Sequence, residues 1–199
     1  EKAYKLVPYN SLEQKYEDLK FLSRQYNQRI SSVSYTKVQL INLLDQTMPG
    51  ITHLLPLRSR NPEQCVLLLF VKRFKSFDEI NKIGKTRFLS SYATLVKKTR
   101  DRHAPSKGLA IYELAKNSIT TRGEDPYIQL AQSQCVDLLS SSQNAADEII
   151  LQMQTIAETI PEYRVLRSMA GVGDRLGPVI LAEIGDIRRF HSGKALNSF

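Results

Sequence analysis

The chain has 199 residues, a formal net charge of +8 at pH 7 and a pI of about 9.5. This length can bury one sizeable core or two small ones, and the positive charge favours an anionic partner. No signal peptide and no apolar run of roughly 18 residues occurs, which argues against a membrane partner. Cys65 and Cys135 fit reduced thiols in a cytoplasmic protein, and the isolated histidines lack metal-ligand spacing, so no metal site is predicted.

Residues 1–50 contain the first predicted long helix. Ser11 and Gln14 match a capping box, and neither proline nor glycine follows until Pro49-Gly50. Apolar residues recur every seven positions, at Leu12, Leu19, Tyr26, Val33 and Leu40. This spacing predicts a coiled-coil seam, with packing of the helix on a globular core as the alternative.

Residues 51–124 are predicted to form a basic lobe of short helices, punctuated by Asn61-Pro62, Ser76 and Gly84. Between Arg58 and Lys107, thirteen Lys or Arg stand against four Asp or Glu, a net charge of +9. Such a concentration predicts contact with the phosphates of DNA or RNA, and a solvated charged face is the alternative. Aromatic residues are interleaved with these cations, either as core or as contacts. The predicted contact residues are Lys72, Arg73, Lys75, Lys82, Lys85, Arg87, Lys97, Lys98, Arg100 and Arg102.

Residues 125–160 contain the second predicted long helix, which opens at Asp125-Pro126. The residues of its predicted buried stripe are alternately three and four positions apart. The register of this spacing shifts by one residue before Met153. No Lys or Arg lies between Arg122 and Arg164, so this helix is expected to pack on the first long helix, antiparallel, rather than to face phosphate. The stripe consists of Ile128, Ala131, Cys135, Leu138, Ser142, Ala145 and Ile149, then Met153, Ile156 and Ile160.

Residues 161–199 are predicted to begin with a helix-hairpin-helix around Gly171-Val172-Gly173. The glycines allow positive φ and leave backbone N–H groups open to a phosphate, with Arg175 within reach. We therefore expect Gly171, Val172, Gly173 and Arg175 to bind nucleic acid, and Gly173→Val to distort the turn.

These elements together predict an all-α fold. Two long helices form an antiparallel coiled-coil stalk, a basic helical lobe is inserted between them, and a helix-hairpin-helix stub follows. The long helices are expected to support a homo-oligomer. The predicted divisions are 1–50, 51–124, 125–160 and 161–199.

The run Leu181-Ala182-Glu183-Ile184-Gly185-Asp186-Ile187-Arg188-Arg189-Phe190, with Ser192 and Leu196 after it, resembles the C-terminal domain of the DEDD insertion-sequence transposases, relatives of the Piv-type DNA invertases. Two departures from the family pattern are Ala170, where proline is usual, and Gly177-Pro178, where small helix-forming residues are usual. The segment from Leu40 to Gly50 is similar to the one that follows the catalytic domain of the same family.

The resemblance implies an internal fragment of a DNA transposase or site-specific recombinase. It would extend from after an RNase-H-like domain into the start of the C-terminal domain. The family's metal-binding acids, its Mg²⁺ and its proposed serine nucleophile would then lie outside residues 1–199, so no catalytic residue or cofactor is assigned here. The implied roles are self-association and binding of DNA or a guide RNA. The alternatives are a non-catalytic helix-hairpin-helix protein of DNA binding or repair, and a pure coiled-coil scaffold.

Overall fold

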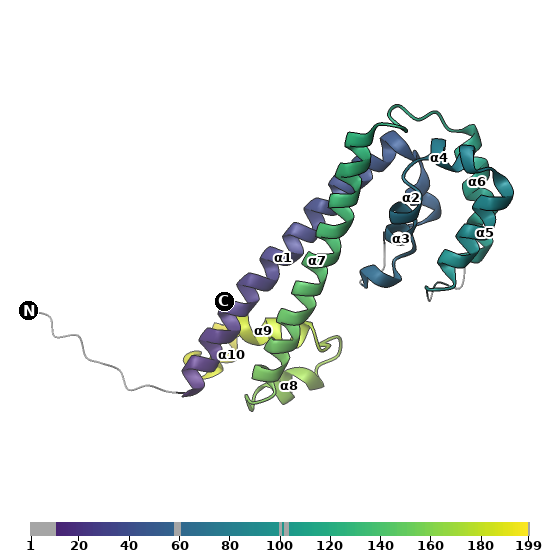
Figure 1. The fold of residues 1–199 in the computed structure, drawn as a ribbon. Helices are drawn as coiled ribbons and strands as arrows, with labels where there is room; N and C mark the ends of the chain where they lie inside the picture. Colours follow the sequence, from purple (N-terminus) through teal and green to yellow (C-terminus); the bar gives the residue numbers. More distant parts are fainter. Residues whose placement is uncertain (1–10, 58–60, 100, 102–103, 199) are drawn as a thin grey trace, which may run out of the picture. The chain divides into compact units, whose positions relative to one another are not determined.

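The structure, a computed structural model, describes residues 11–57, 61–99, 101 and 104–198. Within these residues the elements are helices joined by turns, with no strand, so the predicted all-α fold is confirmed (Figure 1). Three 3₁₀ helices, η1 (Pro62–Gln64), η2 (Pro105–Lys107) and η3 (Ile187–Arg189), accompany the α-helices. The α-helices are α1 (Ser11–Thr47), α2 (Ile51–Leu54), α3 (Val66–Arg73), α4 (Phe77–Ile83), α5 (Lys85–Val96), α6 (Gly108–Asn117), α7 (Pro126–Ala157), α8 (Tyr163–Ser168), α9 (Leu176–Ile184) and α10 (Gly193–Asn197).

Several of these helices begin at the proline and capping residues that the sequence predicted as helix starts. α7 begins with a proline, and the Asp125 carboxylate accepts a hydrogen bond from the Tyr127 N–H at 2.8 Å. This bond lowers the pKa of Asp125. Ser76 caps α4 by accepting from the Glu79 N–H at 3.2 Å, and the Glu79 carboxylate accepts from the Lys75 N–H at 2.9 Å. Both reciprocal bonds satisfy donors that a helix start would otherwise leave open.

The seven-residue pattern on α1 corresponds to its buried side. Leu19, Val33 and Leu40 are all at most 4% exposed, and Ser23, four residues after Leu19, is also buried. Thr36 is also buried, and its hydroxyl donates to the Ser32 carbonyl, so the side chain leaves no unsatisfied polar atom. The stripe is therefore that of a helix packed along one side, and the coiled coil itself stays a prediction.

The buried stripe on α7 differs from the predicted one. Leu138, expected inside, is 48% exposed, and the buried positions continue through Met153 without a slip. The prediction used apolar residues alone, and Gln132 and Gln143 occupy buried positions. A polar residue at a buried position cannot be detected from an apolar pattern. Gln132 is tolerated because its amide donates to the Thr47 hydroxyl. Ile128, Ser142 and Met153 of the predicted stripe are buried as expected. The buried positions are Ile128, Gln132, Val136, Leu139, Ser142, Gln143, Ala146, Ile150, Met153 and Ala157.

The chain divides into two compact units, and each long helix contributes a segment to both. Unit 1 comprises Glu1–Gln28 and Ala145–Phe199, and unit 2 comprises Arg29–Asn144. No helix in the described part of the chain is both long enough and apolar enough to cross a membrane.

Unit 2 has an aromatic core. The rings of Phe70 and Phe74 have centroids 5.1 Å apart, as do those of Phe74 and Phe88, and Phe88 stacks on Tyr92 at 5.9 Å. The Tyr92 hydroxyl donates to the Ala104 carbonyl at 2.8 Å, which satisfies the only polar atom of that side chain. This core holds α3 against α5 and thereby fixes the spacing between the basic side chains that the two helices carry on their outer surfaces.

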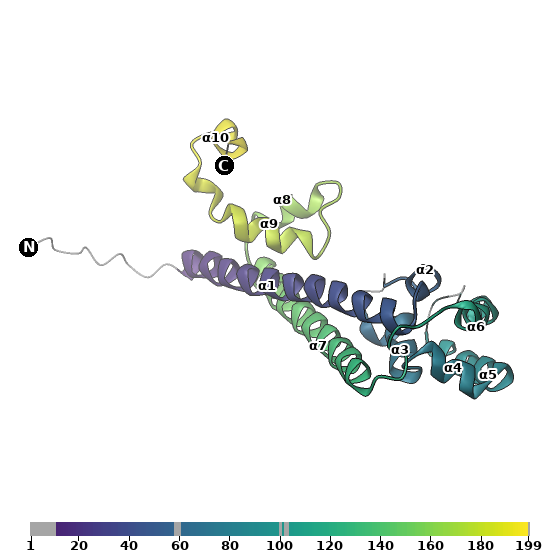
Figure 2. The same ribbon diagram turned by 90° about the horizontal axis from the view of Figure 1, so that it is seen from above.

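Unit 1 packs the start of α1 and the end of α7 against α8 and α9. Its core contains Leu19, Met153, Tyr163 and Leu181. α8 and α9 lie side by side in both views (Figures 1 and 2). Gly177 permits this approach, because a Cβ there would lie 2.9 Å from the Tyr163 ring.

Candidate nucleic-acid interface

The predicted basic contacts of unit 2 are solvent-exposed wherever the structure describes them. Arg100 and Arg102 lie outside the described residues. The other eight, Lys72, Arg73, Lys75, Lys82, Lys85, Arg87, Lys97 and Lys98, are exposed on α3, α4, α5 and the adjoining turns. Their charges are therefore available to a ligand in solvent, although their binding of nucleic acid stays a prediction.

Four of these cations have an acidic neighbour. Lys72 Nζ lies 3.0 Å from Asp137 Oδ1, Arg73 Nη1 lies 4.0 Å from Glu79 Oε1, and Lys85 Nζ lies 3.9 Å from Glu113 Oε1. Lys82 pairs with Glu124, and that hydrogen bond raises the lysine pKa. Ion pairs this exposed are screened by solvent and contribute little to stability, so a polyanion can replace them.

The other four exposed cations form no ion pair among the residues that the structure describes. They are Lys75, Arg87, Lys97 and Lys98. Lys97 and Lys98 are consecutive, but only Lys98 reaches the groove described next. The two lysines therefore form a natural pair for comparison.

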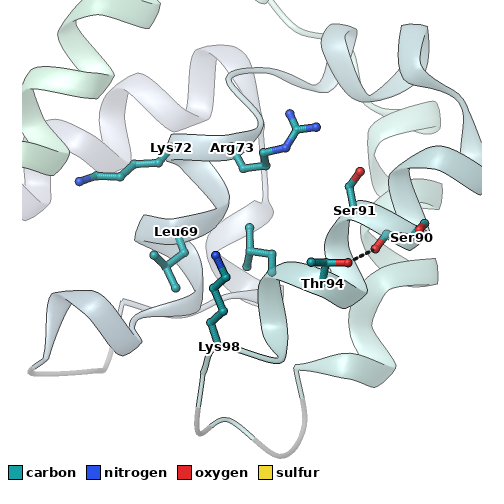
Figure 3. Close-up of a pocket in the computed structure, with 8 residues that line it drawn as sticks. Leu69, Lys72, Arg73, Ser90, Ser91, Thr94 and Lys98 are labelled. Carbon is teal, nitrogen blue, oxygen red and sulfur yellow. Dashed lines mark hydrogen bonds between the residues drawn. The ribbon is translucent and has the colours of Figure 1, made fainter.

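A groove of about 520 Å³ lies in unit 2 between α3 and α5 (Figure 3). Arg73 and Lys72 come from the end of α3, while three hydroxyl residues come from α5, followed by Lys98. Lys98 extends back between the helices, whereas Lys72 points away from the hydroxyl row and pairs with Asp137. The lining residues are Leu69, Lys72, Arg73, Ser90, Ser91, Thr94, Leu95 and Lys98.

The hydroxyl residues of the groove were not identified from the sequence. Ser90, Ser91 and Thr94 face the groove because their spacing on α5 places them on adjoining parts of one helix side. The Thr94 hydroxyl already donates to the Ser90 carbonyl at 3.0 Å. The signal in the sequence was a Ser-Ser-x-x-Thr run among cations, which carries meaning only once α3 is known to lie opposite.

The interleaved aromatic residues of the lobe are core rather than contacts. Phe74, Phe77, Phe88 and Tyr92 are each at most 1% exposed. They cannot stack on nucleic-acid bases without unfolding the unit. Only Phe74 influences the surface, because the Arg73 guanidinium lies over its ring at 4.9 Å from the centroid.

The Gly171-Val172-Gly173 turn joins α8 to α9, as predicted, but only one of its two glycines has a positive φ. Gly171 has φ 86°, whereas Gly173 has no positive φ and offers open space to a Cβ. The expected distortion by Gly173→Val stays a prediction, but it finds no support in the backbone conformation of Gly173 or in the space around a Cβ there. Among the described residues, the N–H groups of Gly171 and Gly173 have no hydrogen-bond partner, while that of Val172 bonds to the Met169 carbonyl at 3.2 Å.

Two arginines hold the turn in place. Arg167 donates to the Val172 carbonyl at 2.8 Å and pairs with Asp174. The Arg175 guanidinium lies 2.6 Å from Asp147. Burial disfavours the charge of Arg175, but the hydrogen bond and the charge of Asp147 outweigh it and raise the arginine pKa. The proposed phosphate ligand Arg175 is thus engaged within unit 1 in this structure, and Arg167, not identified from the sequence, braces the turn.

Two acidic residues of the run from Leu181 to Phe190 form structural hydrogen bonds within unit 1. Asp186 caps η3 by accepting from the Arg188 N–H at 2.9 Å and binds the Arg188 guanidinium, which lowers the pKa of Asp186. Glu183 accepts a hydrogen bond from Ser23 at 3.4 Å. In the part of the chain that the structure describes, no three His, Cys, Asp or Glu residues gather as metal ligands, so the residues present do not fit a divalent-cation site.

Comparison with known proteins relates one segment of the chain to a family. The sequence model of the family described as Transposase IS116/IS110/IS902 family matches residues 163–199, which include α8, α9, η3 and α10. No curated protein and no solved structure matches the chain. The match supports a transposase-related function.

Proposed function

We propose that this chain provides DNA binding and self-association to a DNA transposase or site-specific recombinase of the DEDD type. The observation that carries the proposal is the family match over residues 163–199. The expected chemistry of such enzymes, a strand transfer with divalent metal, would need a carboxylate cluster. We assign no metal-dependent step to the described residues, since they contain no such cluster.

Nucleic-acid binding is supported by the charge distribution of unit 2. The stretch from Arg58 to Lys107 carries +9, more than the +8 of the whole chain. Its described cations project from short helices that are anchored by a rigid aromatic core. Phosphate contacts from such a surface release counterions, so affinity falls steeply with salt. A guide RNA would meet the same cations as DNA.

The test of this role is a binding titration of the chain with a duplex of insertion-sequence ends and with a structured RNA. We expect binding at low salt to at least one of them, with an affinity that declines linearly on logarithmic axes as salt rises. Absence of binding to both nucleic acids at low salt would contradict the proposed function.

Self-association is supported by an exposed apolar stripe on the part of α7 in unit 2. Tyr127, Leu130 and Leu138 are 77%, 57% and 48% exposed. Their spacing places them on one side of the helix, away from its buried stripe. We propose that a second copy of the chain covers this stripe, because exposed apolar patches mark interaction sites and most soluble oligomers are homo-oligomers.

The corresponding test compares Leu130→Gln with Leu151→Gln, since both leucines are on α7 and both are 57% exposed. Leu151 lies off the proposed stripe. Sedimentation analysis should show weaker association for Leu130→Gln and unchanged association for Leu151→Gln. A monomeric wild-type chain, or equal effects of the two changes, would refute this interface.

A further inference from the structure

The groove between α3 and α5 combines charge, hydrogen-bond donors and apolar walls in one place. Arg73 and Lys98 supply two charges from opposite sides, and Ser90 and Ser91 add hydroxyls. The lining that the structure describes contains no acidic side chain. Leu69 and Leu95 provide the apolar part of the wall. This combination suits a ligand with two faces. One face carries negative charge and accepts hydrogen bonds from hydroxyl groups, and the other face is apolar.

We propose that the groove binds the sugar-phosphate backbone of one nucleic-acid strand. Arg73 and Lys98 neutralise the phosphates, the Ser90 and Ser91 hydroxyls donate hydrogen bonds to phosphate oxygens, and Leu69 and Leu95 contact the sugar carbons. The inference rests on the proposed nucleic-acid-binding function and narrows it from a whole basic lobe to one groove.

The lining favours recognition of backbone rather than of bases. A site that reads unpaired bases presents exposed aromatic rings for stacking. The aromatic residues behind this groove, Phe74, Phe88 and Tyr92, are closed off in the core. Binding should therefore be independent of base sequence. The phosphodiester chemistry is common to DNA and RNA, so duplex DNA and a structured RNA form separate arms of the test.

Lys72 belongs to the rim of the groove. Its ammonium group points toward α7 and lies 3.0 Å from Asp137, so it is left intact in the decisive variant. Besides its position over the Phe74 ring, Arg73 has a long ion pair with Glu79, and Lys98 forms no ion pair among the described residues. These two side chains are therefore the ones to change.

The main experiment compares two double variants of equal charge. Arg73→Gln with Lys98→Gln removes the groove charges, and Lys85→Gln with Lys97→Gln removes two charges elsewhere in the lobe. The controls are close matches: Arg73 and Lys85 side chains are both 52% exposed, with acids 4.0 and 3.9 Å away, and Lys97 precedes Lys98 directly. Glutamine keeps most of the side-chain stem, so packing over Phe74 is largely retained.

We expect the groove variant to weaken binding by roughly tenfold or more at near-physiological salt, and the control by less than about threefold. On duplex DNA the groove variant should flatten the logarithmic salt slope by up to about 1.8, the contribution of two phosphates, and on a single strand by about 1.4. The loss should be the same for unrelated base sequences. Circular dichroism and thermal unfolding confirm that both variants remain folded.

Further variants test the contribution of the groove hydroxyls and the effect of a negative charge inside the groove. Ser90→Ala with Ser91→Ala should weaken binding several-fold without altering the salt slope, because no charge is removed. Thr94→Glu should weaken binding strongly, since it places a negative charge in the groove, whereas Ala93→Glu places the same charge on a neighbouring exposed position outside it.

The outcomes separate this inference from the proposed function. If the wild-type chain binds nucleic acid but both double variants lose affinity equally, or neither does, the groove assignment is overturned and the function stands. If the wild-type chain binds neither DNA nor RNA, the proposed function fails and the groove fails with it. A loss confined to the groove variant in one arm assigns the groove to that nucleic acid.

Discussion

Gly177 illustrates how a single residue sets the geometry of unit 1. A Cβ at this position would meet the Tyr163 ring at 2.9 Å and Arg167 Cδ at 3.3 Å, whereas a Cβ at Gly173 would meet nothing within 4 Å. The Gly177-Pro178 departure from the transposase pattern thus accompanies a tight contact between α8 and α9. Pro178 is compatible with it because it falls in the first turn of α9.

Gly177→Ala should lower the free energy of unfolding by about 1–3 kcal/mol, because α8 and α9 must separate to accept the methyl group. Gly173→Ala is the control and should change it by less than about 0.5 kcal/mol. Denaturant unfolding of both variants measures the difference. Equal stability of the two variants would show that the helices separate without cost.

Tyr16 gives unit 1 a dependence on alkaline pH. Burial, together with the negative charges of Glu162 and Asp186, raises its pKa from 10.0 to about 12. Between these values the unfolded chain releases the phenolic proton and the folded chain keeps it, so stability is full below pH 10 and falls as pH rises toward 12. Tyr92 acts in the same direction in unit 2, since burial and Asp101 raise its pKa.

We therefore expect Tyr16→Phe to lose less stability than the wild-type chain as pH rises from about 9 to about 11. The exposed Tyr35→Phe on the same helix is the control and should follow the wild type. Denaturant midpoints at several pH values provide the measurement. Parallel curves for the wild type and Tyr16→Phe would contradict the assignment.

At the scale of elements, α7 contains a buried polar side chain with an unsatisfied oxygen atom. Gln132 is 1% exposed, and its Oε1 is the buried side-chain atom without a hydrogen-bond partner among the described residues. Its amide donates to Thr47, whose hydroxyl in turn donates to the Leu43 carbonyl, so Thr47 remains satisfied without it. An unsatisfied buried acceptor is destabilising.

Gln132→Met should accordingly raise the free energy of unfolding by about 1 kcal/mol, because it fills the same space without the orphaned oxygen. Gln134→Met, at an exposed position of the same helix, serves as the comparison and should have little effect. A thermal midpoint for Gln132→Met below that of the wild type would show that the oxygen is satisfied.

Helix ends and helix faces were not equally predictable from the sequence. The start of α1, the cap of α4 and the start of α7 follow from local residue chemistry and were predicted. The buried face of α7 depends on which partners Gln132 and Gln143 meet, and local pattern cannot supply that. The groove was missed for the same reason, because Ser90 and Arg73 are brought together only by the packing of the aromatic core.

At the scale of the whole molecule, charge is segregated along the chain. The stretch from Arg58 to Lys107 carries +9, so nearly all the long-range attraction for a polyanion originates in unit 2. We expect the association rate with DNA to fall with salt more steeply in the wild type than in a chain carrying the four glutamines of both double variants. Stopped-flow measurements compare the salt dependence of the association rate in the two chains. Equal slopes would show that these four cations do not supply the long-range attraction.

The division of the long helices between two units has a consequence for the order of folding. Unit 2 is continuous in sequence, so its core can form as soon as Asn144 has been synthesised. Tyr16 and Glu162, which meet in unit 1, are 146 positions apart. The start of α1 must therefore keep its apolar side exposed until the last quarter of the chain arrives, and closing this long loop is expected to be the slow step. During that interval, Tyr16 and Leu19 expose apolar surface that the folded unit 1 buries.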